Sequence, residues 1–453
     1  MLVLKFGGTS VADQAAITRL TDIVRAARDN QPIVVVSALG GVTDGLLGAA
    51  AQAAVGDAAG ATAHVRQLHE RHLEVAGVIA DSATRVGVEA SLAEMFDELA
   101  SILSALSVIK EVSPRSLDAI AATGELASSR IVAAALSAQG LPSAWIDARQ
   151  VMVTSAEHTA AIPDLEETRA RLVPVVSALV AAGTIPVIGG FVGATAAGVT
   201  TTLGRGGSDY SAAIVGACLG ASEIQIWTDV DGMLTADPRL VPDAQLVPEL
   251  SFDEASELAY FGAKVLHPAT ILPAVAHGIP VRILNSSKPE GRGTLINATR
   301  SAAGRPLTAI ASKRRVTVVD VASTRMLMAH GFLHKLFGVF ERHATSVDVV
   351  TTSEVSVSLT VDDTRRLPEI LAELGEFSDV TRQDNMAVLC AVGEGIQGDA
   401  LFVSQLLMAL SPVSIRMLSQ AAERRNITVV IPDVELPAAL SRLHDAFFRS
   451  ATL

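Results

Sequence analysis

Short apolar runs alternate with longer helical stretches over the first two-thirds of the chain. These runs lie at 2–4, 33–36, 185–188, 224–227 and 281–284. Strands that alternate with helices in this way build a mainly parallel sheet with helices on both faces. The stretch 50–107 has amphipathic periodicity and little strand character. We therefore predict an α/β domain with a helical excursion that forms a lid or a wall over its site.

The stretch 172–194 is uncharged over a length that could span a membrane. Pro174, Gly183 and Pro186 interrupt it, and a Gly-Gly pair follows. We therefore predict a helix followed by a buried parallel strand, and no membrane partner.

The pattern changes near residue 313 and then repeats. Strands are predicted at 316–321, 347–352 and 355–361, helices at 331–343 and 368–374, and a closing strand near 378–381. The same order returns at 386–392, 401–410, 413–418, 427–431 and 436–448. A repeated βαββα order predicts two ferredoxin-like units in the tail.

Composition narrows the functional classes. The 453 residues include 48 acidic and 35 basic side chains, for a net charge of −13, and only 4% are aromatic. Nucleic-acid binding is therefore not expected. Cys218 and Cys390 lie far apart without CxxC spacing, which predicts neither a disulfide framework nor a zinc site. The first residues lack the pattern of a secretory signal, so we expect a cytoplasmic protein.

Two glycine-rich segments carry the candidate chemistry. The first predicted strand runs into Lys5-Phe6-Gly7-Gly8, where glycines let backbone amides approach an anion. Taken alone, this is more typical of a tight strand-to-helix turn with an incidental lysine than of an anion site, and it is no Walker A loop. The segment 200–210 reads TTTLGRGGSDY and precedes a helical run. Ser208 or Asp209 would cap that helix in any protein. A cap does not explain the arginine and three glycines, whereas an anion site at a helix N-terminus does.

Two further polar segments follow predicted strands or helices. Residues 227–239 combine a strand end with a turn, and 261–268 read FGAKVLHP. Together with 5–13 and 200–210, these segments strongly resemble the aspartokinases of the amino-acid kinase family. The resemblance spans nearly the whole chain.

The resemblance implies a fold and an activity. The fold would be an αβα sandwich with a mainly parallel central sheet over 1–300, followed by two ACT domains, which are ferredoxin-like α+β modules, at 313–385 and 386–453. The enzyme would use ATP and Mg²⁺ to phosphorylate the side-chain carboxylate of L-aspartate, giving 4-phospho-L-aspartate, the first step of lysine, threonine and methionine biosynthesis. An amino acid, with L-lysine as the candidate, would act as feedback effector. We expect a homodimer or higher homo-oligomer through the exposed edges of the ACT sheets.

The resemblance also assigns candidate site residues. Lys5 and Asp209 resemble the catalytic pair. The amino-acid contacts would be Ser37, Thr43, Glu125, Arg205, Gly206, Gly207 and Ser208. The nucleotide contacts would be Lys5, Gly7, Gly8, Thr228, Asp229, Leu234, Asp237, Arg239, Lys264 and Val265. Leu234 departs from the family, because relatives can place a tyrosine there.

The candidate effector contacts lie in the first ACT unit. By the same resemblance they are Met326, Ala329, Phe332, Leu333, Ser346, Val347, Asp348, Ser353 and Glu354. Asp348 and Glu354 would pair with a cationic effector. Ala329 departs from the family, because lysine-binding relatives can carry a hydroxyl there. An ordinary core strand with surface acids remains the alternative.

The chemistry needs few special groups. A carboxylate with a pKa of about 3.9 is already a nucleophile at neutral pH, so no general base is required. Charge neutralisation and positioning carry phosphoryl transfer. Mg²⁺ normally arrives on the phosphates, so no dedicated metal cage is expected. His64, His69 and His72 lie at offsets of five and eight, which predicts a solvated helical face rather than a metal site.

Two other functions remain open at this stage. Another amino-acid kinase, such as one acting on glutamate, would share the fold. A catalytically silent amino-acid sensor would keep the fold and signal through the tail. The presence of both Lys5 and Asp209 gives no sign of lost chemistry.

Overall fold

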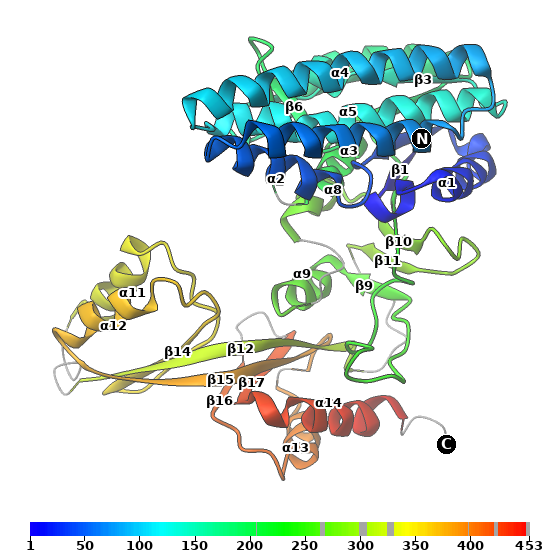
Figure 1. Ribbon diagram of the computed structural model, residues 1–453. Helices are drawn as coiled ribbons and strands as arrows, with labels where there is room; N and C mark the ends of the chain where they lie inside the picture. Colours follow the sequence, from blue (N-terminus) through cyan, green and yellow to red (C-terminus); the bar gives the residue numbers. More distant parts are fainter. Residues whose placement is uncertain are drawn as a thin grey trace. The chain divides into compact units, whose positions relative to one another are not determined.

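The computed structural model describes residues 1–204, 206–262, 268–298, 306–323, 330–396, 398–420 and 425–449. These residues form two compact units, coloured along the chain in Figure 1. The first unit comprises Met1–Met233 and Val265–Arg300. The second comprises Leu234–Lys264 and Ser301–Leu453.

A mainly parallel sheet forms the centre of the first unit. Its strands are β1 (Leu2–Phe6), β2 (Pro32–Val36), β3 (Ser143–Ile146), β5 (Ile185–Gly189), β8 (Glu223–Thr228), β10 (Val281–Asn285) and β11 (Thr294–Asn297). They follow the order β3-β5-β2-β1-β8-β10-β11, and only β10 and β11 pair antiparallel. Phe6 aligns with Val36 and Trp227. The carboxyl ends of β1, β2 and β8 therefore meet at one edge, where open α/β sheets bind ligands.

Helices cover both faces of this sheet. They are α1 (Gln14–Ala26), α2 (Val42–Ala54), α3 (Ala58–Ala76), α4 (Ser82–Ile109), α5 (Pro114–Ala138), α6 (Ala148–Val151), α7 (Leu165–Ala181), α8 (Gly207–Leu219) and α10 (Leu272–Ala276). Leu4 and Phe6 pack into a core with residues of α1 and α5. Because side chains alternate along a strand, Lys5 points to the opposite face, where its partner Asp209 lies on α8.

The helical excursion consists of α2, α3 and α4, which pack beside α5 (Figure 1). This layer corrects one expectation, because His72 is fully buried rather than solvated. Its Nδ1 lies 2.6 Å from the Leu68 carbonyl oxygen, and its ring centroid lies 5.1 Å from that of Phe96 on α4. His72 faces the neighbouring helix, so packing between helices overrides the solvated face that the spacing predicted.

Two apolar stretches of the first unit have lengths typical of membrane spans. The stretch 172–194 forms the end of α7, the buried strand β5 and part of β6 (Val192–Thr195), as predicted. Among the described residues, α5 is the helix that is long and apolar enough to cross a membrane. Because 83% of its most apolar window is buried inside the structure, α5 has the character of a core helix. A small sheet of β4 (Val153–Thr154), β6 and β7 (Thr200–Thr202) lies in the same unit.

The second unit is built on an antiparallel sheet. Its strands are β12 (Ala309–Ala322), β13 (Val350–Thr352), β14 (Ser356–Val361), β15 (Asp379–Val392), β16 (Met417–Gln420) and β17 (Asn426–Pro432), in the order β13-β14-β12-β15-β17-β16. The helices are α11 (Phe332–Arg342), α12 (Leu367–Gly375), α13 (Ala400–Ala409) and α14 (Leu436–His444). The segment before residue 264 adds β9 (Glu249–Ser251) and α9 (Phe252–Tyr260).

Two long strands connect the predicted repeats. The first repeat runs from β12 through α11, β13, β14 and α12 to β15, and α11 and α12 share an apolar core with β14. The second runs from the later part of β15 through α13, β16 and β17 to α14. Residues 309–314 of β12 pair with 387–392 of β15 and complete the second repeat. Residue 386, where we expected the second domain to begin, lies within the continuous strand β15.

Candidate active site

An ion pair marks one end of a cavity in the first unit. Nζ of Lys5, on β1, lies 2.5 Å from Oδ1 of Asp209, in the first turn of α8. The two side chains are 9% and 16% exposed, so water screens this attraction only partly. Two segments that lie far apart in the sequence thus meet in an ion pair at the carboxyl end of β1.

The glycines after β1 bring two loops into contact. A Cβ placed on Gly8 would lie 3.1 Å from the Ala38 carbonyl oxygen, closer than a side chain normally packs. The Gly40 amide donates a hydrogen bond to the Gly8 carbonyl at 2.9 Å. The Gly7 amide donates to the Trp227 carbonyl at 2.9 Å, so it is already engaged. Close approach of the loops therefore explains this Gly-Gly pair better than anion contact through Gly7.

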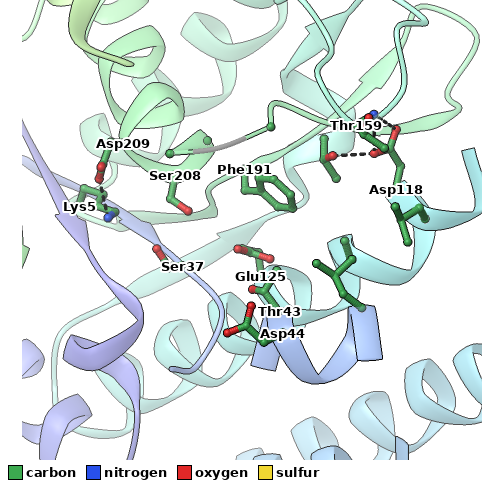
Figure 2. A pocket seen from close by; sticks show the side chains of 17 residues that line it. Lys5, Ser37, Thr43, Asp44, Asp118, Glu125, Thr159, Phe191, Ser208 and Asp209 are labelled. Atoms are coloured by element: carbon green, nitrogen blue, oxygen red, sulfur yellow. Dashed lines mark hydrogen bonds and ion pairs between the residues drawn. The ribbon is translucent and has the colours of Figure 1, made fainter. Parts of the chain in front are cut away.

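Figure 2 shows the cavity that extends from this ion pair. Its volume is about 560 Å³. It brings together eight residues predicted from the sequence, namely Lys5, Ser37, Thr43, Glu125, Gly206, Gly207, Ser208 and Asp209. Thr202 and Gly204, from the segment 200–210 singled out in the sequence, also line it. Sequence reasoning missed the other lining residues, which are Asp44, Leu47, Leu117, Asp118, Ala121, Thr159 and Phe191.

Two of the missed residues have unusual backbone conformations. Phe191 has φ of +64° and Thr159 has φ of +70°, a region that residues other than glycine rarely adopt. A Cβ on Gly207 would lie 2.6 Å from the Phe191 ring, so the glycine lets this ring pack against the start of α8. The only sequence signal for Phe191 is its position after Gly189-Gly190, at the end of a predicted strand.

Glu125 lies in the middle of the cavity in the view of Figure 2, on helix α5. It is 3% exposed, and its Oε2 has no hydrogen-bond partner among the described residues. Burial raises the pKa of this carboxyl to about 8, although the Ala38 amide and the charge of Lys5 oppose the rise. Burial therefore favours the protonated form of Glu125 at neutral pH, and a bound cation would favour the ionised form.

The start of α8 differs from the helix cap considered from the sequence. Gly206, with φ of +70°, occupies the cap position, and no side chain caps the helix. Gly207, Ser208 and Asp209 form its first turn instead, and all three line the cavity. A helix N-terminus with no side-chain cap can accept an anionic group.

The candidate nucleotide residues are divided among several places. Thr228 ends β8, and its hydroxyl donates to the adjacent Asp229 carboxylate at 3.1 Å. In the second unit, Leu234 bridges to Leu246, and Arg239 pairs with Asp237 at 2.7 Å. Arg205, Lys264 and Val265 lie outside the described residues.

The candidate effector residues lie at three places in the second unit. Phe332 and Leu333 begin α11, Ser346, Val347 and Asp348 precede β13, and Ser353 and Glu354 form the turn between β13 and β14. The Asp348 side chain is 4% exposed and already holds Nζ of Lys313 at 2.9 Å and the Tyr260 hydroxyl at 3.1 Å. A cationic ligand at Asp348 would therefore compete with Lys313. Met326 and Ala329 lie outside the described residues.

No group of three His, Cys, Asp or Glu side chains that could hold a metal ion occurs in the described part of the chain. The cavity offers instead a lysine, a helix N-terminus and hydroxyls, which suit phosphate and carboxylate groups.

Comparison with known proteins agrees with this geometry. The profile of the amino acid kinase family matches residues 1–285, and an ACT domain profile matches 389–447. Aspartokinase 3, chloroplastic, of Arabidopsis thaliana is 36% identical over 473 aligned residues, covering 99% of this chain and 82% of that protein. The crystal structure of E. coli aspartokinase III with aspartate and ADP has a TM-score of 0.84 at 33% identity and covers 99% of this chain and 100% of that one. A structure of the E. coli enzyme with lysine and aspartate has a TM-score of 0.83 at 33% identity and covers 99% of both chains. The chain therefore belongs to the aspartokinases of the amino acid kinase family.

Proposed function

We propose that this chain transfers the γ-phosphoryl group of ATP to the side-chain carboxylate of L-aspartate. The observation that carries the proposal is one cavity that joins a lysine, a helix N-terminus and a buried glutamate whose Oε2 has no hydrogen-bond partner among the described residues. Mg-ATP is the donor, and 4-phospho-L-aspartate and ADP are the products. A carboxylate oxygen of aspartate attacks the γ-phosphorus, and the bond to the bridging oxygen breaks as ADP leaves with the electron pair.

Lys5 and Asp209 act at the phosphoryl end of the cavity. The ammonium of Lys5 neutralises the charge that develops on the phosphoryl oxygens, and Asp209 holds the ammonium in place. The amides at the start of α8 add positive potential at the same end. The attacking carboxylate is ionised at neutral pH, so no residue acts as a general base.

The other end of the cavity binds the amino acid. Glu125 accepts a hydrogen bond from the substrate ammonium, because its Oε2 is buried and has no hydrogen-bond partner among the described residues. Arg205 binds the α-carboxylate through its bidentate fork. The remaining contacts are Ser37, Thr43, Gly206, Gly207 and Ser208.

The nucleotide lies along the carboxyl ends of β1 and β8. Gly7 and Gly8 follow β1 and let the nucleotide approach the backbone closely, although the Gly7 amide is already bonded to Trp227, and Thr228 and Asp229 lie at the end of β8. The further contacts are Leu234, Asp237, Arg239, Lys264 and Val265. Mg²⁺ enters with the phosphates as part of the substrate and withdraws charge from them.

The tail regulates this activity by binding an amino acid. The E. coli structure with lysine supports L-lysine as the effector to test first. The contacts are Met326, Ala329, Phe332, Leu333, Ser346, Val347, Asp348, Ser353 and Glu354. The protein works in the cytoplasm as a homodimer or higher homo-oligomer through its ACT sheets. Sedimentation that shows only a 47 kDa species at assay concentration would contradict the assembly.

A hydroxamate assay tests the proposal, because hydroxylamine traps acyl phosphates. The purified chain with Mg-ATP should give hydroxamate with L-aspartate and much less with L-glutamate. More product with glutamate would assign a different amino-acid kinase. Binding of aspartate in a thermal-shift measurement without any ADP formation would assign a sensor.

A further inference from the structure

A second buried carboxylate borders the cavity and has no role in the transfer step. Asp118 lies in the second turn of α5, two helical turns before Glu125, and is 1% exposed. A buried carboxylate is unfavourable unless hydrogen bonds replace the lost water. Its partners therefore indicate why this position carries an acid.

Three donors from two other segments surround this carboxylate, as Figure 2 shows for Thr159. Nδ1 of His158 donates to Oδ2 at 2.6 Å, and the hydroxyl of Thr202 donates to Oδ1 at 2.6 Å. The Thr159 amide donates to both oxygens, at 3.0 and 3.1 Å. A carboxylate has about four acceptor positions, and these contacts occupy them. Asp118 therefore joins protein segments and has no acceptor left for a substrate ammonium.

The backbone at Thr159 depends on these contacts. Its φ of +70° lies in a region that residues other than glycine rarely adopt, so the surroundings must hold it. The Thr159 carbonyl oxygen would lie 3.1 Å from a Cβ on Gly204, which itself has φ of +76°. The Thr202 carbonyl also accepts a hydrogen bond from the Ala161 amide at 2.9 Å. Asp118 thus fixes two segments that meet the start of the glycine turn before α8.

Contacts that do not involve Asp118 also hold the glycine turn before α8. The Leu203 amide donates to the Phe191 carbonyl at 2.9 Å, and the Gly207 amide donates to the Gly204 carbonyl at 3.0 Å. Gly204, Gly206 and Ser208 line the same cavity as Glu125. A shift of Thr159 or Thr202 would therefore move the wall of the amino-acid end of the cavity. The Lys5–Asp209 pair at the other end has its own 2.5 Å contact, and Asp118 makes no hydrogen bond or ion pair with it in the described part of the chain.

We propose that Asp118 is a positioning residue for the amino-acid substrate, which it serves by holding the Thr159 turn and the end of β7 against Gly204. The inference rests on the proposed function of the cavity. It assigns to Asp118 an effect on amino-acid affinity and none on nucleotide affinity.

Steady-state kinetics of Asp118→Ala and Asp118→Asn in the full chain test this. The KM for aspartate should rise about tenfold or more in Asp118→Ala and less in Asp118→Asn, while the KM for ATP and kcat stay within about twofold. A merely structural role would lower the melting temperature and the active fraction without changing the KM for aspartate. Asp147→Asn is the matched control, because Asp147 is a helix-capping acid outside the cavity that pairs with Arg149 at 2.6 Å.

A second pair of variants keeps the test decisive if Asp118→Ala does not fold. Thr202→Val removes one donor and should raise the KM for aspartate, whereas Thr202→Ser keeps the hydroxyl and should have the smaller effect. An unchanged KM for aspartate in the folded variants, or an equal rise in the KM for ATP, would overturn the positioning role. A wild-type chain that forms no ADP with aspartate would instead overturn the proposed function, so the two failures are distinguishable.

Discussion

Lys5 and Asp209 form a 2.5 Å ion pair across the junction of β1 and α8, although nearly half the chain separates them in sequence. The pair places a cation and the N-terminus of a helix at the same end of the cavity. Electrostatic groups arranged before the reaction need no reorganisation when charge develops, which is the main source of catalysis in phosphoryl transfer.

Lys5→Met should therefore lower kcat strongly while the protein remains folded. Loss of one group that stabilises developing charge typically costs about 100- to 1000-fold in kcat. ADP release measured under saturating aspartate and Mg-ATP checks this. Lys110→Met is the control, because Lys110 is exposed at the end of α4 and lies outside the cavity. A Lys5→Met enzyme within tenfold of wild type would show that Lys5 does not stabilise the transferring group.

The sequence alone predicted the parts of the site that belong to local motifs. Glycines and a lysine after an apolar run, and glycines before a helix, indicate loops at strand ends whatever the rest of the chain does. Lys5 and the residues Gly206, Gly207, Ser208 and Asp209 of the glycine-rich segment line the cavity. Ser37, Thr43 and Glu125 line it as well, but they were expected only from the resemblance to the aspartokinases. Asp118 and Phe191 could not be predicted, because they reach the cavity through packing of α5 and of the corner after β5. Nothing in their immediate sequence distinguishes them from ordinary helix and turn residues.

In the tail, the boundary between the two repeats was likewise beyond what the sequence could predict. The order of strands and helices was predictable from apolar runs, and two repeats were expected. Residues 385 and 386 were expected to end the first ACT domain and to begin the second. In the structure, both lie within the single strand β15. Pairing with β12 along the whole length keeps the strand continuous, and this pairing is a long-range property.

Binding of aspartate should release a proton from Glu125. Burial gives this carboxyl a pKa of about 8 in the empty cavity, so it is mostly protonated at pH 7. An ammonium beside it favours the ionised form and lowers the pKa, so binding displaces the proton. Apparent affinity for aspartate should therefore rise with pH up to about 8 and then level off.

Calorimetry in buffers of different ionisation enthalpy measures this proton directly. At pH 7, wild type should release close to one proton per aspartate bound, and the value should fall towards zero at pH 9. Glu125→Gln should bind aspartate weakly and without this release. Equal binding enthalpies in all buffers at pH 7 would contradict the role of Glu125.

An effector that binds Asp348 must displace the ammonium of Lys313. Lys313 lies 2.9 Å from Asp348 and 2.6 Å from Asp362, and its side chain is 23% exposed. Replacing Lys313 by Met removes the internal competitor. Partly exposed ion pairs contribute roughly 0.2–1 kcal/mol, so the L-lysine concentration for half inhibition should fall by about 1.4- to fivefold.

Inhibition curves for Lys313→Met measure the shift. Arg365→Met is the control, because Arg365 is an exposed cation of the same unit that pairs with Asp363. Asp348→Asn should weaken inhibition instead. If Lys313→Met needs more lysine than wild type, the internal ammonium supports the effector site rather than competing for it.

His72 should make the first unit sensitive to acid. Burial lowers the pKa of this imidazole to about 4, from a usual value of 6.5. Between these values the unfolded chain binds a proton that the folded chain does not, so the stability from this group is present above pH 6.5 and is lost as pH falls. From pH 7 to pH 5 the loss is about 2 kcal/mol.

His72→Leu keeps an apolar side chain against Phe96 and removes the titrating group. Its melting temperature should fall less between pH 7 and pH 5 than that of wild type, even if it is lower at pH 7 because the bond to the Leu68 carbonyl is gone. His64→Leu serves as the control, because His64 is only half-buried on the same helix and contacts Gln52. Thermal unfolding of the three proteins at both pH values separates the two effects. The expected pH dependence arises because the imidazole of His72 gains a proton in the unfolded chain and stays neutral in the folded one. Parallel pH dependences in all three proteins would therefore show that protonation of His72 does not cause the loss of stability.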